Sequence, residues 1–520
     1  MAGDEAYRPL LLQEKPYFDG CSGCLVERRK AASKGAPKKE FALIAFMVLC
    51  NALPISSIFP FIYFMVRDFG IAKADTQIAT YAGYIGSSLM VGRFLSSTLW
   101  GILADRYGRK PTIIVGTASI FVFNTIFGFS TNFWIALASR FSLGLVNGML
   151  GPVRAYASEI CTEEYQALGL SLVGTMWGLG LVIGPAIGGY LAQPSDKYPS
   201  LFSSGSLFDR FPYALPCLCI SAISFLGLPL SFLLPETIHT HKGVSNSSAK
   251  RKQISNKKSN SVEEKKDGDS DIVELSGFHE AKRPLWRNWG MVAAISIYSL
   301  WGLHDMAYSE IFSLWCVSPE TYGGLGLTTS DVGNILSAAG AALLVFQLFV
   351  FAPLANRFGA IQIIRVPIVM TLPLVAVYPL IARLDGVSLW IAIIPAACIK
   401  NVLSLCIITG LFILINNSAP TKQRGFVNGI SMTCMSLFKA IGPASAGVVF
   451  SWAEGRMDAS FLPGMWMVFF LLDIVVVIIL AATFEPMLPR SLLQPVQEES
   501  ERSEPSTKDA ELQRAASFTF

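Results

Sequence analysis

Long apolar runs alternate with short polar segments along most of this chain. Each run is close to the roughly 20 residues that a helix needs to cross a bilayer. Inside lipid a backbone must satisfy its hydrogen bonds internally, which a helix does. The pattern therefore predicts an all-α integral membrane protein with about twelve transmembrane helices, at residues 41–66, 78–103, 112–130, 134–157, 168–192, 213–234, 288–317, 330–353, 362–383, 388–415, 425–452 and 464–484.

Three segments lack such runs. Residues 1–40 form a polar N-terminal tail, and residues 235–287 and 485–520 are rich in polar and charged side chains. Because segments that bury little apolar surface stay disordered, the last two are predicted to be a disordered linker and a disordered C-terminal tail. The linker divides the remaining chain into two six-helix bundles, at residues 41–234 and 288–484.

The two bundles carry related sequences. LADRYG at residues 103–108 is echoed by LANRFG at 354–359, and the IGP of residues 183–185 is echoed at 441–443. Both pairs have nearly the same separation, so the halves are predicted to be parallel repeats. Such repeats pack as two pseudo-symmetric bundles with a cavity between them.

Composition and charge exclude several classes of protein. Of the 520 residues, 52% are hydrophobic and 15% charged, against about 25% charged in soluble domains. The net charge of +4 is too small to indicate a nucleic-acid partner. Nucleotide-binding and hydrolase motifs do not occur, so we expect neither enzymatic activity nor a cofactor.

Basic residues indicate the orientation of the chain in the membrane. They gather before the first run, at 106–110 and in the linker, which predicts that both termini are cytosolic.

Two motifs resemble those of the major facilitator superfamily. Residues 101–110 match its G-x-L-A-D-R-x-G-R-K loop, which implies the major facilitator fold. The resemblance assigns a gating role to Gly101, Asp105, Arg106, Gly108, Arg109 and Lys110, with Arg357 in the degraded second copy. The fifth run is similar to the antiporter signature of this superfamily. That match implies a hinge, sealed against the eighth helix, at Ser171, Gly180, Gly184, Pro185, Gly188 and Gly189.

Several ionisable residues lie inside apolar runs, where they are costly and normally face the bundle interior. The seventh run contains three of them, and histidine beside a carboxylate suits proton transfer. We expect proton or substrate handling by His304, Asp305, Glu310, Arg140, Lys400 and Lys439. The alternatives are a buried pair that ties helices together, or cations that extend to the membrane surface.

Two further motifs resemble the plant zinc-induced facilitator-like family. They are CSGC at residues 21–24, where Ser22 replaces the usual Pro, and PETIH at 235–239. The resemblance implies proton-coupled antiport of nicotianamine, a mugineic acid or their metal complexes, and a part in zinc and iron homeostasis. It implies the vacuolar or the plasma membrane. The sorting-like pattern of Glu5 with Leu10 and Leu11 slightly favours the vacuole.

The cytosolic Cys pair has the spacing of metal ligands, and a structural zinc site has four ligands. Cys21 and Cys24 are therefore candidates for a zinc site, completed by His239 and His241, although a packing or trafficking role is the alternative. A different class of function, a membrane metal sensor, stays open on this basis. The family resemblance also leaves open an antiporter of potassium or an auxin-like organic anion. The expected partners are a small solute, protons and lipid, with the protein acting as a monomer.

Overall fold

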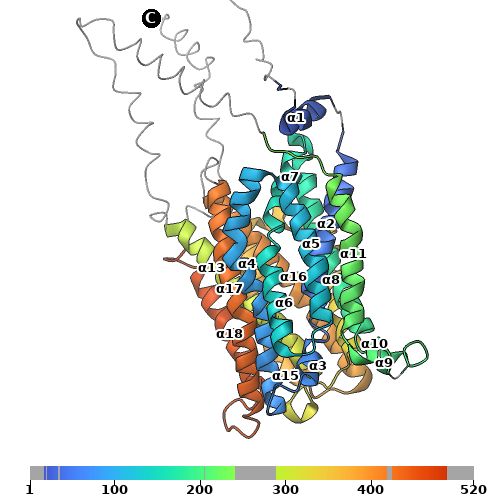
Figure 1. The fold of residues 1–520 in the computed structure, drawn as a ribbon. Coiled ribbons are helices and arrows are strands. Elements are labelled where there is room, and N and C mark those ends of the chain that lie inside the picture. The colour runs from blue at the N-terminus through green and yellow to red at the C-terminus, as the bar shows by residue number, and fades with distance from the viewer. Residues whose placement is uncertain are drawn as a thin grey trace, which may run out of the picture.

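The computed structural model describes residues 17–18, 20–32, 35–203, 205–239, 289–418 and 424–488, and within these ranges it contains helices and no strand (Figure 1). The helices are α1 (Ser22–Ala32), α2 (Lys38–Ser56), α3 (Ile62–Asp68), α4 (Ile78–Tyr107), α5 (Arg109–Gly128), α6 (Phe133–Val146), α7 (Leu150–Glu159), α8 (Glu163–Leu191), α9 (Pro194–Lys197), α10 (Leu207–Arg210), α11 (Ala214–Phe232), α13 (Trp289–Val317), α14 (Thr329–Phe349), α15 (Phe351–Ile381), α16 (Gly386–Ser418), α17 (Arg424–Glu454) and α18 (Met465–Ala482).

The predicted all-α membrane fold is confirmed. Ten helical stretches in the described ranges are long and apolar enough to cross a membrane. The second and seventh runs correspond to α4 and α13, which are 30 and 29 residues long but are not among these ten. Large apolar side chains such as Trp134, Leu226, Val387 and Ile391 are exposed on the outer surface. In a membrane this surface faces lipid chains, which explains why the chain can expose it.

Two of the predicted spans are interrupted. The first divides into α2 and α3, and the fourth into α6 and α7. Breaking a helix frees backbone groups, and neighbours bind them. The carbonyl of Pro54 accepts a hydrogen bond from Arg140 at 2.8 Å, and that of Leu145 accepts one from the Trp100 indole at 2.9 Å. A Cβ at Gly148 would lie 2.0 Å from that indole ring, so glycine permits this approach.

The two ends of the bundle differ in their segments. We call the end that carries α1 the tail end, and the opposite end, with α3, α9 and α10, the loop end (Figure 1). Residues 235–239 were assigned from sequence to the linker, but they pack at the tail end, where Thr237 is buried. The remaining linker, residues 489–520 and the sorting-like pattern at residues 5–11 lie outside the described residues.

The halves meet where α4 packs against α17 and α8 against α14. The closest approaches lie toward the loop end. A Cβ at Gly83 would be 2.4 Å from the Pro443 carbonyl oxygen, and one at Gly189 would be 2.8 Å from Gly333 Cα. Toward the tail end, α4 instead exposes Leu99. The two halves are therefore sealed together at the loop end.

Lys197 forms hydrogen bonds across this contact between the halves. Its ammonium donates hydrogen bonds to the Gly189 carbonyl and to Thr329 Oγ1 of the other half. Burial lowers the pKa of Lys197 to about 8. The contact between the halves at the loop end thus includes an amine that titrates near neutral pH.

Candidate transport site and gating loop

A buried ion pair links α13 to α16. Lys400 Nζ lies 3.1 Å from Asp305 Oδ1, and the lysine side chain is 1% exposed. Ser404 donates a second hydrogen bond to the same carboxylate, and the ammonium lies 3.9 Å from the ring centre of Tyr308. The structure thus joins two of the predicted residues, from distant parts of the C-terminal half, in a site where charge is held away from water.

His304 has different surroundings from its neighbour Asp305, as the 100° rotation between successive helical residues predicts. Its ring is fully buried and lies 4.8 Å from the Trp301 ring, between centroids. Neither ring nitrogen has a hydrogen-bond partner among the described residues. Asp305, and not His304, is therefore the partner of Lys400.

Glu310 points toward the other half of the protein. It is 1% exposed, and a Cβ added at Gly86 of α4 would lie 3.0 Å from its Oε2 atom. Arg140 of α6 is close enough for its charge to act on this carboxylate. The three ionisable groups of α13 thus do not form one cluster, since Glu310 faces α4 of the N-terminal half and Asp305 faces α16.

Lys439 of α17 adds a second cation near Asp305. It lies within electrostatic range of Asp305, and also of Arg93 and Arg154 from the N-terminal half. Two cations, Lys400 and Lys439, therefore act on the Asp305 carboxylate, while Lys439 also lies near arginines of the other half. The sequence analysis missed Arg154. Its signal was available, because it lies 14 positions after Arg140 in the same predicted span, close to four full helical turns.

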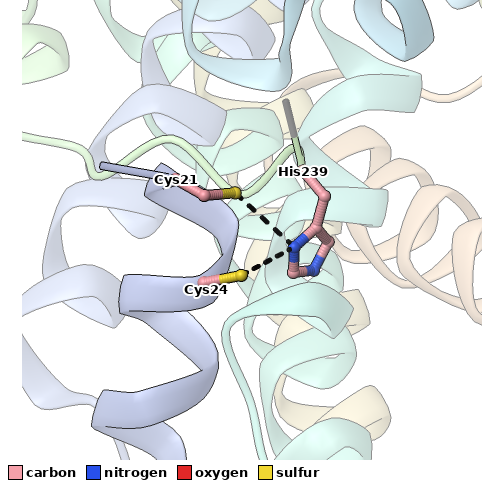
Figure 2. A group of neighbouring side chains, drawn as sticks. All are labelled: Cys21, Cys24 and His239. Atoms are coloured by element: carbon pink, nitrogen blue, oxygen red, sulfur yellow. Dashed lines mark hydrogen bonds between the residues drawn. The ribbon is translucent and has the colours of Figure 1, made fainter. Parts of the chain in front are cut away.

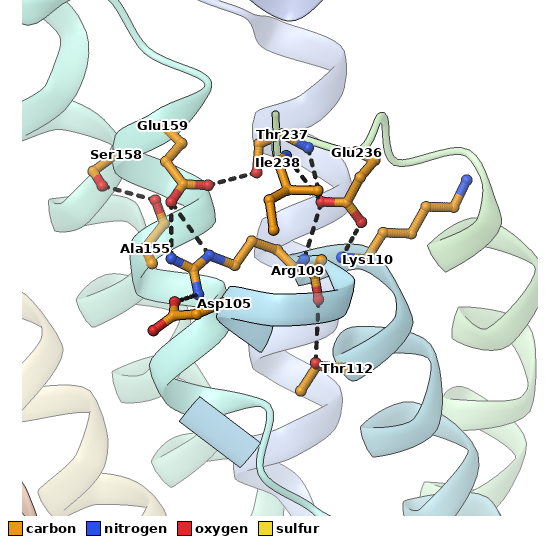
Figure 3. A network of polar contacts seen from close by, with 11 residues as sticks. Asp105, Arg109, Lys110, Thr112, Ala155, Ser158, Glu159, Glu236, Thr237 and Ile238 are labelled. Atoms are coloured by element: carbon orange, nitrogen blue, oxygen red, sulfur yellow. Dashed lines mark hydrogen bonds and ion pairs between the residues drawn. The ribbon is translucent and has the colours of Figure 1, made fainter. Parts of the chain in front are cut away.

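The gating loop is a network of charged groups at the tail end (Figure 3). Arg109 forms ion pairs with Asp105 and, at 3.1 Å, with Glu159 at the end of α7. Gly108 makes the reversal between α4 and α5 with a φ of +116°, a conformation that glycine adopts easily. Gly101 and Arg106 lie within α4 and not in the turn, so the turn between α4 and α5 is shorter than the ten-residue motif at 101–110. The Lys110 ammonium donates to the Phe232 carbonyl at 2.7 Å.

Glu236 caps the first turn of α5, and the sequence analysis did not assign it this role. Its carboxylate accepts the backbone N–H groups of Arg109 and Lys110 at 3.0 and 3.1 Å. A helix N-terminus has free N–H groups and a partial positive charge, so a carboxylate stabilises it. The adjacent Thr237 donates to Glu159 (Figure 3). The PETIH segment therefore holds the gating loop together.

The second copy of the loop retains the turn but has lost the network. Gly359 has φ +72° and ψ 165°, close to the +116° and 161° of Gly108. Arg357 forms no ion pair with the residues that the structure describes. The internal repeat is thus visible in the backbone, while the charged contacts belong to the first copy.

The small residues of α8 pack mainly against α2. Cβ atoms at Gly180, Gly184 and Gly188 would lie 2.3 Å or less from Ala52, Ser56 and Ser57. The contact expected with the eighth span is also present, at Gly189 and Pro185: a Cβ at Gly333 of α14 would lie 2.9 Å from the Pro185 carbonyl oxygen. Pro185 lies within a continuous helix and Ser171 is exposed. The signature therefore provides a close seam within the N-terminal half as well as between the halves.

The two cysteines and His239 meet at the tail end (Figure 2). The Sγ atoms of Cys21 and Cys24 lie 3.8 and 3.6 Å from His239 Nδ1. Both cysteines are buried. Of the four predicted ligands, the structure gathers three from segments far apart in sequence, and His241 lies outside the described residues.

Comparison with known proteins identifies the family. The model of the Major Facilitator Superfamily matches residues 44–315 and 290–517. Protein ZINC INDUCED FACILITATOR-LIKE 1 of Arabidopsis thaliana is 49% identical over 486 residues, covering 93% of this chain and 98% of the relative. Protein ZINC INDUCED FACILITATOR 1 of the same plant is 48% identical and covers 94% and 99%. The chain belongs to the zinc-induced facilitator-like family of the major facilitator superfamily.

The fold of this zinc-induced facilitator-like chain is similar to solved transporter structures. The crystal structure of a D-xylose-proton symporter superposes with a TM-score of 0.65, covering 88% of this chain and 99% of the symporter at 12% identity. The chain is therefore a multi-pass membrane transporter for a small solute, in a superfamily whose members are not typically enzymes.

Proposed function

We propose that this protein is a proton-coupled antiporter that moves a small organic metal chelator, of the nicotianamine or mugineic-acid type, or its metal complex. The two six-helix bundles, residues 41–234 and 288–484, rock about a site between them, with both termini in the cytosol and the vacuolar membrane favoured over the plasma membrane. The observation that carries this proposal is the buried Asp305–Lys400 pair, with Lys439 nearby.

The carboxylate of Asp305 and the ammonium of Lys400 are complementary to the two charges of a zwitterionic solute. A buried ion pair loses stability when one partner is left alone. A solute with separate carboxylate and ammonium groups can replace each partner of the pair, its carboxylate on Lys400 and its ammonium on Asp305. The cations near Lys439, namely Arg93 and Arg154, can accommodate the further carboxylates of a chelator.

Proton antiport follows from competition for one group. A proton on the Asp305 carboxyl removes the negative charge that the ammonium of the solute needs. Proton and solute then bind in turn, which couples their opposite movements. The seal at the loop end corresponds to a state open toward the tail end, from which the solute enters.

Flux into proteoliposomes under an imposed pH gradient tests this proposal, with nicotianamine and a mugineic acid as solutes, each with and without zinc. Saturable, gradient-driven uptake is expected. Asp305→Asn abolishes the gradient-driven component, while Asp385→Asn, an exposed aspartate, serves as the matched control. Wild-type flux in Asp305→Asn would remove the aspartate from the mechanism. If potassium or an organic anion moves instead, the chelator is the wrong solute.

A metal sensor with an inactive transporter core is the second candidate. The meeting of Cys21, Cys24 and His239 favours it. Zinc binding without movement of any tested solute is the result that selects this candidate over the antiporter.

A further inference from the structure

The cluster of Cys21, Cys24 and His239 has the dimensions of a zinc site. Zinc binds sulfur at about 2.3 Å and imidazole nitrogen at about 2.0–2.1 Å in a tetrahedron. These lengths put a ligating sulfur and nitrogen about 3.6 Å apart. The observed Sγ–Nδ1 distances are 3.8 and 3.6 Å. The ligand atoms all lie within 4.8 Å of one another, so a metal ion requires little rearrangement.

The backbone brings the histidine to the cysteines. Gly23 donates its N–H to the Ile238 carbonyl at 3.2 Å. A Cβ at Gly23 would lie 2.9 Å from the His239 ring and from that carbonyl oxygen, so the glycine of the motif permits the approach. Ser22, which stands where related motifs have proline, also approaches Ile238 O at 3.5 Å. These two contacts with the Ile238 carbonyl hold the segment that contains the cysteines against the segment that contains His239.

The Nε2 side of the imidazole also has a neighbour. Glu27, one turn after Cys24 on α1, lies 3.7 Å from His239 Nε2. Metal-bound histidines commonly direct their second nitrogen toward a carboxylate, which fixes the tautomer and raises the basicity of the ligand. Nδ1 faces the sulfurs (Figure 2), and Nε2 lies on the side of the Glu27 carboxylate. The orientation of the ring therefore suits metal ligation through Nδ1.

We propose that Cys21, Cys24 and His239 bind a zinc ion at the tail end, and that zinc occupancy stabilises the gating loop. This site is separate from the Asp305–Lys400 pair in the C-terminal half, so the metal is a regulator and not the cargo. Thiolate ligands select zinc over magnesium and calcium, which prefer oxygen. The described residues supply three of the four ligands of a tetrahedral site, which leaves the fourth position to another group.

The connection to the gating loop is short. His239 follows Ile238, Thr237 and Glu236, and Glu236 accepts the N–H groups of Arg109 and Lys110. Thr237 donates to Glu159, which pairs with Arg109. A cavity of about 290 Å³ between α1 and this network is lined by Glu27, Asp105, Arg109 and His239. Fixing His239 to α1 therefore restricts the segment that caps α5.

Metal titration of the purified full-length protein in detergent tests the site. Cobalt is used as a spectroscopic substitute for zinc. We expect a single bound ion with a thiolate-to-cobalt charge-transfer band and the intense visible bands of tetrahedral cobalt, all displaced by zinc. Cys21→Ser/Cys24→Ser and His239→Ala lose these bands. Cys161→Ser, a buried cysteine at the same end, retains them. Equal cobalt binding by the double serine variant, or no thiolate band in the wild type, overturns the site.

Glu27→Gln distinguishes a metal site from simple packing. Removing a carboxylate partner of a ligating histidine typically weakens metal binding about tenfold or more. We expect that loss of affinity with unchanged cobalt bands. Unchanged affinity contradicts the assigned orientation of His239.

Hydrogen exchange of the wild type, with and without zinc, tests the coupling and needs no variant. The amides of Gly23, Arg109 and Lys110 are expected to exchange more slowly with zinc. Zinc that binds but leaves the exchange of Arg109 and Lys110 unchanged overturns the link to the gating loop. None of these measurements depends on solute movement, so their failure is distinct from failure of the antiporter proposal.

Discussion

The Asp305–Lys400 pair allows a double-mutant test of buried charge. Lys400→Met removes the ammonium and leaves Asp305 with the Ser404 hydroxyl and the neighbouring Lys439. Removing one partner of a buried pair costs about 3–5 kcal/mol. The aspartate side chain is 22% exposed, so we expect the lower limit, about 3 kcal/mol. Asp305→Asn leaves Lys400, which is 1% exposed, uncompensated, and we expect about 4 kcal/mol.

The double variant is expected to recover most of this loss. Replacing both charges removes the buried pair without leaving one of its partners alone, and such replacements are often neutral in stability. The double variant should therefore lie within about 1 kcal/mol of the wild type, against about 7 kcal/mol if the single losses add. Reversible unfolding in mixed detergent micelles, followed by the fluorescence of buried Trp301 and Trp315, measures the free energies. Additive losses would refute the claim that these charges depend on each other.

Two further predictions concern helix packing and pH. Gly184→Ala places a Cβ 1.9 Å from Ser56 Oγ, whereas Gly101→Ala, also within a helix, meets nothing within 4 Å. The thermal midpoint should fall for the first and stay or rise for the second; equal midpoints would contradict the close seam between α8 and α2. For Lys197, the unfolded chain binds more protons than the folded protein between about pH 8 and 10.5, so stability should rise with pH there. Lys197→Met should remove that rise, which a pH series of midpoints would show.

The sequence predicted the helices well and their interruptions poorly. Apolar runs mark what lipid requires of each span, so α8 and α18 follow directly from hydropathy. The break between α6 and α7 depends on Trp100 of another helix, which binds the freed Leu145 carbonyl. Such a contact depends on tertiary packing, and hydropathy does not report it.

The candidate site shows the same limit. The cost of ions in lipid identified Asp305, Lys400 and Glu310 individually. Helix rotation then decides which of them meet, and it separates Glu310 from Asp305. Glu236 and Lys197 were missed because they lie in connecting segments, where charged residues are common and only the fold reveals which backbone groups they bind.

The repeated turns at Gly108 and Gly359 have a consequence for how this molecule can change over evolutionary time. An ancestral duplication supplies two equivalent gates, yet only the first is tethered to a neighbouring segment and, through it, to the cysteines. The buried ion pair, by contrast, belongs to the second half. On the two proposals made above, metal control and solute recognition belong to different copies. A relative can acquire a new solute by changes in one half while it keeps its response to metal in the other, and chimeras that exchange halves should separate the two traits.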